Sequence, residues 1–100
     1  MTRPPVLADS TVATWASAHP PWSLVDGHLV ARFDTPYEHG VEVLRLTEPD
    51  VVALDHHPVV TLRYGSMTVD MFTDDQLGVT EYDLRIAEHF STAVARVAKS

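Results

Sequence analysis

The apolar positions near the start of the chain recur at helical spacing. Val12, Trp15 and Ala16 fall on one face of a helix. Asp9 and Ser10 stand before them and have side chains that suit a helix N-cap. Two consecutive prolines then end the segment, because proline cannot continue a helix. The pattern predicts a short first helix.

Two pairs of strand-like segments carry turn signals between them. Asp26-Gly27 is a strong two-residue hairpin signal between apolar segments. Gly65-Ser66 occupies the same place between two segments rich in β-branched and aromatic residues. We therefore expect four antiparallel strands, at about 22–25, 28–33, 59–64 and 67–72.

Helical spacing returns between the two hairpins and again at the end of the chain. Apolar residues from 37 to 54 predict a second helix. Pro49 removes an amide donor, so this helix should be kinked or divided near Thr47. Thr80, with Asp83 three residues later, predicts the capping box of a last helix. The apolar stripe of that helix consists of Ile86, Phe90, Val94 and Val97.

The predicted elements follow the order αββαββα. Antiparallel strands with segregated helices make an α+β fold, here a two-layer sandwich with three helices on one face of a four-stranded antiparallel sheet. No repeat or linker divides the sequence, so residues 1–100 are expected to form one domain. A domain of this size buries only about 60 to 65% of the surface of its unfolded chain, and self-association is one way to bury more.

Charge and composition exclude several classes of protein. The formal net charge is -7, from fourteen acidic and seven basic residues, and leaves no basic face for nucleic acid. The chain has no cysteine, which fits a reducing compartment. No apolar run approaches about 18 residues, and no apolar segment follows the first five residues, so we expect neither a membrane span nor secretion. These features predict a cytoplasmic protein.

The candidate chemistry is concentrated in Asp55-His56-His57-Pro58, just before the third predicted strand. A neutral imidazole accepts at one nitrogen and donates at the other, and its ordinary pKa lies close to neutrality, so adjacent histidines suit proton transfer. Without further context, the same residues would be two surface histidines followed by a proline turn. The pattern around them favours a site.

Further residues on both sides of this motif belong to the same pattern. After it come Tyr64, Thr73, Gly78-Val79-Thr80 and Asp83, and before it come Trp22, Asp26-Gly27 and Phe33. From about residue 22 to residue 93, the chain therefore resembles the pterin-4a-carbinolamine dehydratase family. That family has a His-His-Pro, an aromatic residue six positions on, a Thr-His, a Gly-hydrophobic-Thr/Ser and an Asp in the last helix. The spacings match without a gap.

The resemblance implies a fold of four antiparallel strands and three helices, assembled as a homodimer or homotetramer. It also implies the loss of water from a 4a-hydroxy-tetrahydropterin, giving the quinonoid dihydropterin, without a cofactor. Matched position by position, the catalytic residues are His56, His57 and Asp74. The substrate-binding residues implied in the same way are Asp55, Pro58, Thr73 and Asp83.

Two positions depart from the family. Its third histidine, directly after the Thr, is Asp74 here, and the acid four residues before its first histidine is Val52. An aspartic acid is a poor proton donor at neutral pH unless burial raises its pKa. A general acid or base contributes about 10²- to 10⁴-fold in rate, so slow dehydration, a changed substrate and loss of catalysis all fit the sequence.

The predicted site residues come from two separate segments, which must lie side by side in the fold to form one site. A strand, a turn and an antiparallel strand should bring the loop after Phe72 back beside Pro58, so that His56, His57 and Asp74 line one concave pocket. The same three residues would compose the two-His-one-carboxylate set of non-haem iron. Adjacent residues in an extended segment point apart, however, and no metal site is predicted.

Other residues have structural interpretations beside the functional ones. Asp83 can serve as a helix cap alone, or can both cap the helix and contact the pocket. Tyr64 and Phe72 are typical of a core or an interface, and Trp15 and Trp22 of a core. The histidines outside the motif are expected at the surface or at an interface, and they are His19, His28, His39 and His89.

Three functions remain open at this point. The first is a dehydratase that acts on a pterin-like small molecule, with His56 and His57 as acid and base. The second is a non-catalytic module, a coactivator or assembly factor that binds a protein partner. The third is a biosynthetic dehydratase or cyclase that keeps the pocket and changes the reaction.

Overall fold

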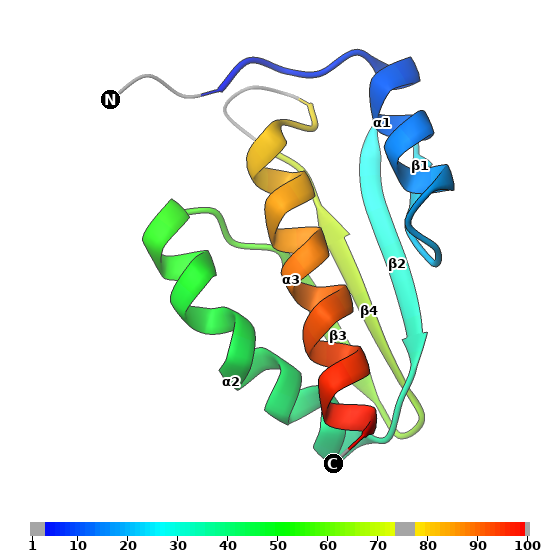
Figure 1. Cartoon of the computed structure of the whole chain (residues 1–100), viewed down its shortest axis with the longest axis vertical. Helices are drawn as coiled ribbons and strands as arrows, with labels where there is room; N and C mark the ends of the chain where they lie inside the picture. Colours follow the sequence, from blue (N-terminus) through cyan, green and yellow to red (C-terminus); the bar gives the residue numbers. More distant parts are fainter. Residues whose placement is uncertain (1–3, 74–77, 100) are drawn as a thin grey trace.

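The computed structural model of the chain describes residues 4–73 and 78–99 (Figure 1). Its helices are α1 (Asp9–Ser17), α2 (Tyr37–Leu54) and α3 (Glu81–Ala98). Its strands are β1 (Ser23–Val25), β2 (His28–Asp34), β3 (Val59–Arg63) and β4 (Ser66–Met71). The order αββαββα that the sequence predicts is confirmed. No helix among the described residues is long and apolar enough to cross a membrane.

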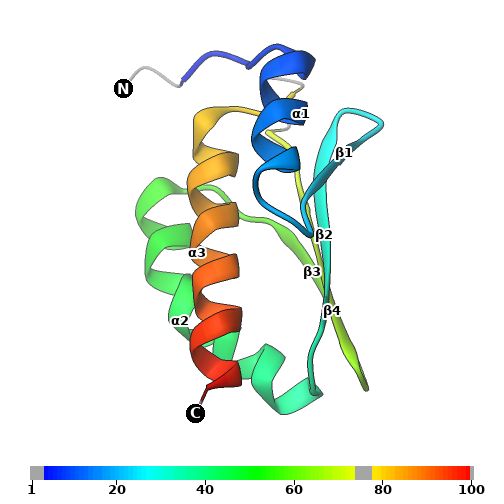
Figure 2. The same ribbon diagram turned by 45° about the vertical axis from the view of Figure 1, so that its right-hand side comes forward.

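The four strands form one antiparallel sheet in the order β1-β2-β4-β3. Figure 2 shows the three helices on one face of this sheet, so the predicted two-layer α+β sandwich is confirmed. Alternate residues of the central strands point toward the helices, because side chains alternate along a strand. The buried ones on β2 and β4 are Leu29, Ala31, Phe33, Met67, Val69 and Met71. They meet the apolar stripe of α3, which the sequence places correctly at Ile86 and Phe90.

The first hairpin turns where the sequence predicts. Val25 pairs with His28, and Asp26 and Gly27 both have positive φ, at 50° and 81°. These angles match the two-residue turns that follow the twist of a hairpin. Trp22, which precedes β1, is buried as expected, and its Nε1 donates a hydrogen bond to Ser91 Oγ at 2.8 Å.

The second hairpin turns one residue earlier than predicted. Arg63 pairs with Ser66, so the turn consists of Tyr64 and Gly65, and Ser66 belongs to β4. Leu62, not Tyr64, therefore lies opposite Met67 on the inner face. Leu62 also packs on α2 where Gly40 leaves room, since a Cβ there would lie 2.6 Å from Leu62 Cδ2. Tyr64 is consequently 96% exposed, so it does not lie in the core, and the alternative of an interface stays a prediction.

Helix α1 begins without a side-chain cap. Ala8 is the N-cap, and Asp9 is already the first helical residue, so the predicted capping by Asp9 or Ser10 is wrong. A backbone contact fixes the chain here instead, because Leu7 N–H donates to Val79 O at 2.8 Å. Asp9 still favours the helix electrostatically, since an acid in the first turn faces the positive end of the helix dipole.

Helix α2 is continuous through Pro49, so the predicted division near Thr47 is wrong. Figure 2 shows that the first turns of α2 run at an angle to the rest of the helix, in keeping with the alternative that it is kinked. Pro49 removes one backbone donor. Thr47 adds a different bond, because its hydroxyl donates to Val43 O at 2.9 Å. Val43 and Thr47 are both buried, so packing holds the helix together across this region.

Candidate functional site

The histidine motif forms the connection between α2 and β3. Asp55 ends α2 in the left-handed conformation, with φ 48° and ψ 48°, and its N–H donates to Val52 O at 3.1 Å. Aspartate adopts this conformation at less cost than most residues with a side chain. His56 N–H donates to Val51 O at 3.1 Å and closes the helix end. The chain then extends through Pro58 into β3.

His56 points into the protein and meets a buried carboxylate. The side chain of His56 is 7% exposed and that of Asp83 is fully buried. Nε2 of His56 is hydrogen-bonded to Oδ1 of Asp83. Because a carboxylate oxygen only accepts, the bridging proton belongs to Nε2. In the neutral imidazole, Nδ1 is then the acceptor, so Asp83 selects the tautomer of His56.

The second oxygen of Asp83 ties two other segments to this histidine. Thr73 Oγ1, just after β4, donates to Asp83 Oδ2 at 2.9 Å. The Thr80 N–H, at the start of α3, donates to the same oxygen at 2.8 Å. The predicted capping box of Thr80 and Asp83 is therefore confirmed. Asp83 caps α3, as the sequence allows, and also bonds to His56, whereas the predicted contact of Asp83 with the pocket stays a prediction.

His57 points outward, away from this network. Its side chain is 64% exposed, and its Nδ1 lies 3.9 Å from Oδ1 of Asp55, which is too long for a hydrogen bond. Consecutive side chains of an extended segment point to opposite sides, and the two histidines follow that rule. Asp74 lies outside the described residues. The predicted pocket that His56, His57 and Asp74 would share therefore stays a prediction.

A groove of about 410 Å³ opens beside His57, between α2 and β3. The residues that line it include His57 and Pro58 of the motif, Val52 of α2 and Val60 of β3. Phe90 of α3 reaches it from the core. The motif thus has a buried polar side, at His56, and a largely apolar open side, at His57.

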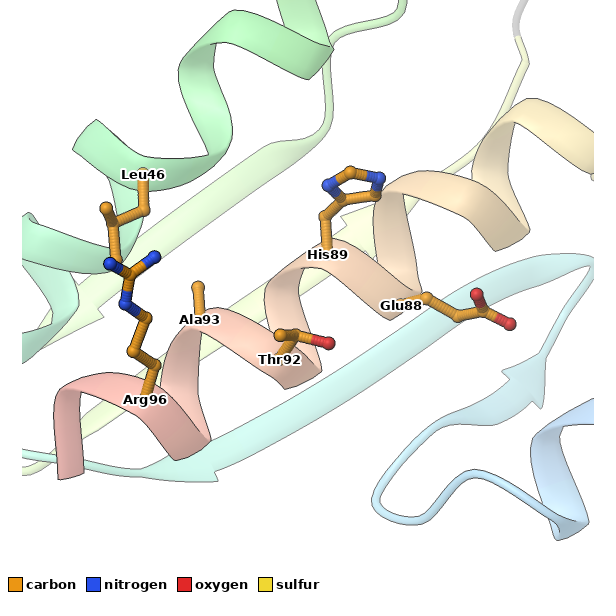
Figure 3. A pocket seen from close by; sticks show the side chains of 6 residues that line it. All are labelled: Leu46, Glu88, His89, Thr92, Ala93 and Arg96. Carbon is orange, nitrogen blue, oxygen red and sulfur yellow. The ribbon is translucent and has the colours of Figure 1, made fainter. Parts of the chain in front are cut away.

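A second hollow, of about 290 Å³, lies on the outer side of α2 and α3 (Figure 3). It contains no residue of the motif. His89 lines it and pairs with Asp50 of α2 at 2.6 Å between Nδ1 and Oδ2. Glu88 and Arg96 place opposite charges at its sides, as Figure 3 shows. This hollow holds surface ion pairs and adds nothing to the candidate site.

Two other histidines have partners that the sequence did not reveal. Nδ1 of His28 on β2 donates to Oδ1 of Asp70 on β4 at 2.7 Å, and the His28 ring stacks on Phe72 at 4.3 Å between centroids. The ring of His19 stacks on Trp15 at 4.1 Å. Cross-strand pairing is invisible in the sequence until the register is known. In the part of the chain described, no three His, Cys, Asp or Glu side chains gather to hold a metal ion.

Comparison with known proteins identifies the family of the chain. The model of the family described as Pterin 4 alpha carbinolamine dehydratase matches residues 5–93. The chain belongs to this family. The family is named for a hydro-lyase reaction, so the expected class of enzyme, a dehydratase, is the one that membership indicates.

Similar proteins come from bacteria and archaea. A candidate pterin-4-alpha-carbinolamine dehydratase from Picosynechococcus is 33% identical over 88 residues, which cover 84% of this chain and 92% of the relative. One from Metallosphaera sedula is 32% identical over 68 residues, covering 67% of this chain and 71% of the relative.

A solved structure supports the fold. The crystal structure of a transcriptional coactivator/pterin dehydratase from Brucella melitensis matches with a TM-score of 0.82 and 23% identity. The match covers 89% of this chain and 98% of the Brucella chain. Both chains therefore share the αββαββα sandwich of the pterin dehydratase family.

Proposed function

We propose that this protein removes water from a 4a-hydroxy-tetrahydropterin or a closely related heterocycle, with His57 as the residue that transfers protons to and from the substrate. The observation that supports this most is the bond between His56 and Asp83. It anchors the motif to α3 and leaves the neighbouring imidazole of His57 exposed beside a groove.

The reaction needs one proton delivered and one removed. The hydroxyl on C4a takes up a proton, the C4a–O bond breaks, and water leaves with the bonding electrons. The adjacent ring nitrogen loses its proton, and the N–H electron pair forms the new C=N bond of the quinonoid dihydropterin. An imidazole suits both steps, because it donates and accepts protons near neutral pH.

The two histidines have different roles in this proposal. His57 is exposed and can meet a substrate, so it is the proposed catalytic residue. His56 is buried and bonded to Asp83, so it is a positioning residue that fixes the turn. Asp83 and Thr73, which the sequence suggested as substrate-binding, bond to each other and to this turn, and we assign them the same positioning role.

The remaining predicted residues complete the proposal. Pro58 lines the groove together with His57, and Asp55 is exposed beside it. Asp74 stands where the family has an imidazole and lies outside the described residues. We propose that Asp74 takes the third catalytic position with reduced efficiency. An ordinary carboxyl is mostly deprotonated at neutral pH, so it seldom carries the proton that an imidazolium could donate.

The test is the rate of 4a-hydroxy-tetrahydropterin dehydration by the purified protein. His57→Ala should lower kcat by about 10²- to 10⁴-fold, the usual contribution of a general acid or base. Asp74→His should raise it by about tenfold or more, which corresponds to at least about 1.4 kcal/mol of transition-state stabilisation. His89→Ala is the matched control, because it removes another exposed histidine away from the motif. A folded protein that neither binds nor converts any tetrahydropterin would contradict the proposal.

A second candidate function is binding to a protein partner. The Brucella relative bears a name that joins a coactivator to a dehydratase. In this chain, Val59 and Tyr64 are strongly exposed on the edge strand β3 and its turn, and exposed apolar residues on an edge strand favour contact with another chain. A homodimer or homotetramer in the cytoplasm belongs to the same set of proposals. Sedimentation of the purified protein would measure its oligomeric state.

A further inference from the structure

The groove beside His57 has a different chemical character from the buried side of the motif. We infer that it binds an apolar, uncharged substituent of the substrate whose ring His57 acts on, and this inference rests on the proposed function. His57 and Pro58 belong to the motif and also line the groove. A substrate placed against His57 therefore has the groove directly beside it.

The walls of the groove are mainly apolar. Val52 is 62% exposed, although a valine gains nothing from contact with water. Val51 and Val60 are half-buried, and Phe90 is fully buried behind them. A bound apolar group would cover valine surface that is now exposed to water.

Apart from His57, which the proposed function assigns to the reacting ring, the polar groups that line the groove are poor partners for a hydroxyl. Thr47 lines it, but its hydroxyl already donates to Val43 O at 2.9 Å, and the residue is buried. Glu48 is exposed, so its carboxylate stays hydrated and gains little from a ligand hydroxyl. A hydroxylated substituent would lose its hydrogen bonds to water in an apolar groove, which is costly. The same carboxylate repels an anionic substituent.

The size of the groove limits the occupant. Its volume of about 410 Å³ lies in the lower part of the range of small-molecule sites, about 300 to 1,000 Å³. Each methylene that leaves water contributes about 0.8 kcal/mol, or about fourfold in binding. A three-carbon chain should therefore favour binding clearly over a single methyl group.

The experiment compares three 4a-hydroxy-tetrahydropterins that carry a methyl, a propyl or a dihydroxypropyl group on the carbon next to the reacting nitrogen. The natural chain should convert the propyl compound with a kcat/KM about tenfold or more above that of the dihydroxypropyl compound. Val52→Glu should abolish most of this preference. Val41→Glu is the matched control, because Val41 is another exposed valine of α2, at 40%, and does not line the groove.

The outcomes separate this inference from the proposed function. Equal kcat/KM for the three compounds, unchanged by Val52→Glu, overturns the groove assignment and leaves the dehydratase intact. If no compound is converted, the proposed function fails, and binding is then measured by NMR with the propyl compound lacking the 4a-hydroxyl. Shifts of the Val51 and Val60 signals that Val52→Glu removes still support the apolar site. If these NMR shifts are absent, the apolar site is overturned. It is also overturned if the protein forms a dimer that Val52→Glu abolishes, since a second copy of the chain then fills the groove.

Discussion

His56 and His57 are neighbours in the chain, yet the structure gives them opposite environments. The side chain of His56 is 7% exposed and bonded to a buried carboxylate, whereas that of His57 is 64% exposed and has no close hydrogen bond to Asp55. The difference arises from one extended segment, which sends alternate side chains to opposite sides. A pair of adjacent histidines can therefore contain one residue that is bonded inside the fold and one that stays open to solvent.

The buried environment of His56 depends on Asp83, which lies 27 positions further along the chain. Asp83 connects the motif to the end of β4 and to the start of α3 through one carboxylate. None of the buried side-chain oxygen or nitrogen atoms in the described part of the chain lacks a hydrogen-bond partner, so this polar network is complete. A complete buried network is rigid, and removing one member leaves the others unsatisfied.

The largest effect is expected for Asp83→Ala. This change leaves His56 and Thr73 without their partner and removes half of the capping box of α3. Each buried donor that loses its partner typically costs about 1 to 3 kcal/mol, and because Asp83 accepts from three groups we expect a loss of unfolding free energy of about 3 to 5 kcal/mol. Urea denaturation followed by circular dichroism would measure it. Glu81→Ala, an exposed acid in the same helical turn, should cost about 0.5 kcal/mol and serves as the control.

The next prediction compares the two histidines directly. His56→Ala should lower the free energy of unfolding by about 2 to 3 kcal/mol, because it leaves the carboxylate of Asp83 buried with one fewer donor. His57→Ala should change it by about 0.5 kcal/mol or less, as is usual for an exposed position. Both values come from the same denaturation experiment. Equal losses for the two variants would mean that the division of roles between them is wrong.

Much of the fold could be predicted from the sequence because its signals are local. Asp26-Gly27 can form a two-residue turn with both φ values positive, and Thr80 with Asp83 can cap a helix, whatever surrounds them. The predictions that were wrong concern features that tertiary packing determines. The second turn moved by one residue because Leu62 packs on Gly40, a contact between β3 and α2 that no local pattern contains.

The site was predictable to the extent that it lies in one motif. The motif and the resemblance point to His56 and His57, but which of the two is buried depends on where α3 begins in space. The sequence alone assigned both as acid and base for that reason. The apolar groove beside His57 was not foreseen, because Val52 and Val60 come from separate elements and only the fold brings them together to line it.

The smallest expected loss of unfolding free energy is for Thr80→Ala, a change that tests the helix cap separately from the bond between Asp83 and His56. Thr80 Oγ1 accepts from the Tyr82 N–H at 3.3 Å, while the bond from the Thr80 N–H to Asp83 uses the backbone. Thr80→Ala therefore removes the cap and keeps Asp83 bound to the backbone and to His56. Loss of a threonine cap typically costs about 1 kcal/mol, so the variant should lose clearly less stability than Asp83→Ala.

Thr80→Ser is the matched control for this last prediction, because it restores the hydroxyl and omits only the methyl group. It should recover most of the unfolding free energy that Thr80→Ala loses, since serine caps helices as well as threonine does. The dehydration rate should change little in either variant, because the contact between His56 and Asp83 remains. A Thr80→Ala variant as unstable as Asp83→Ala would show that the start of α3, and not the bond to His56, accounts for the stability of the buried network.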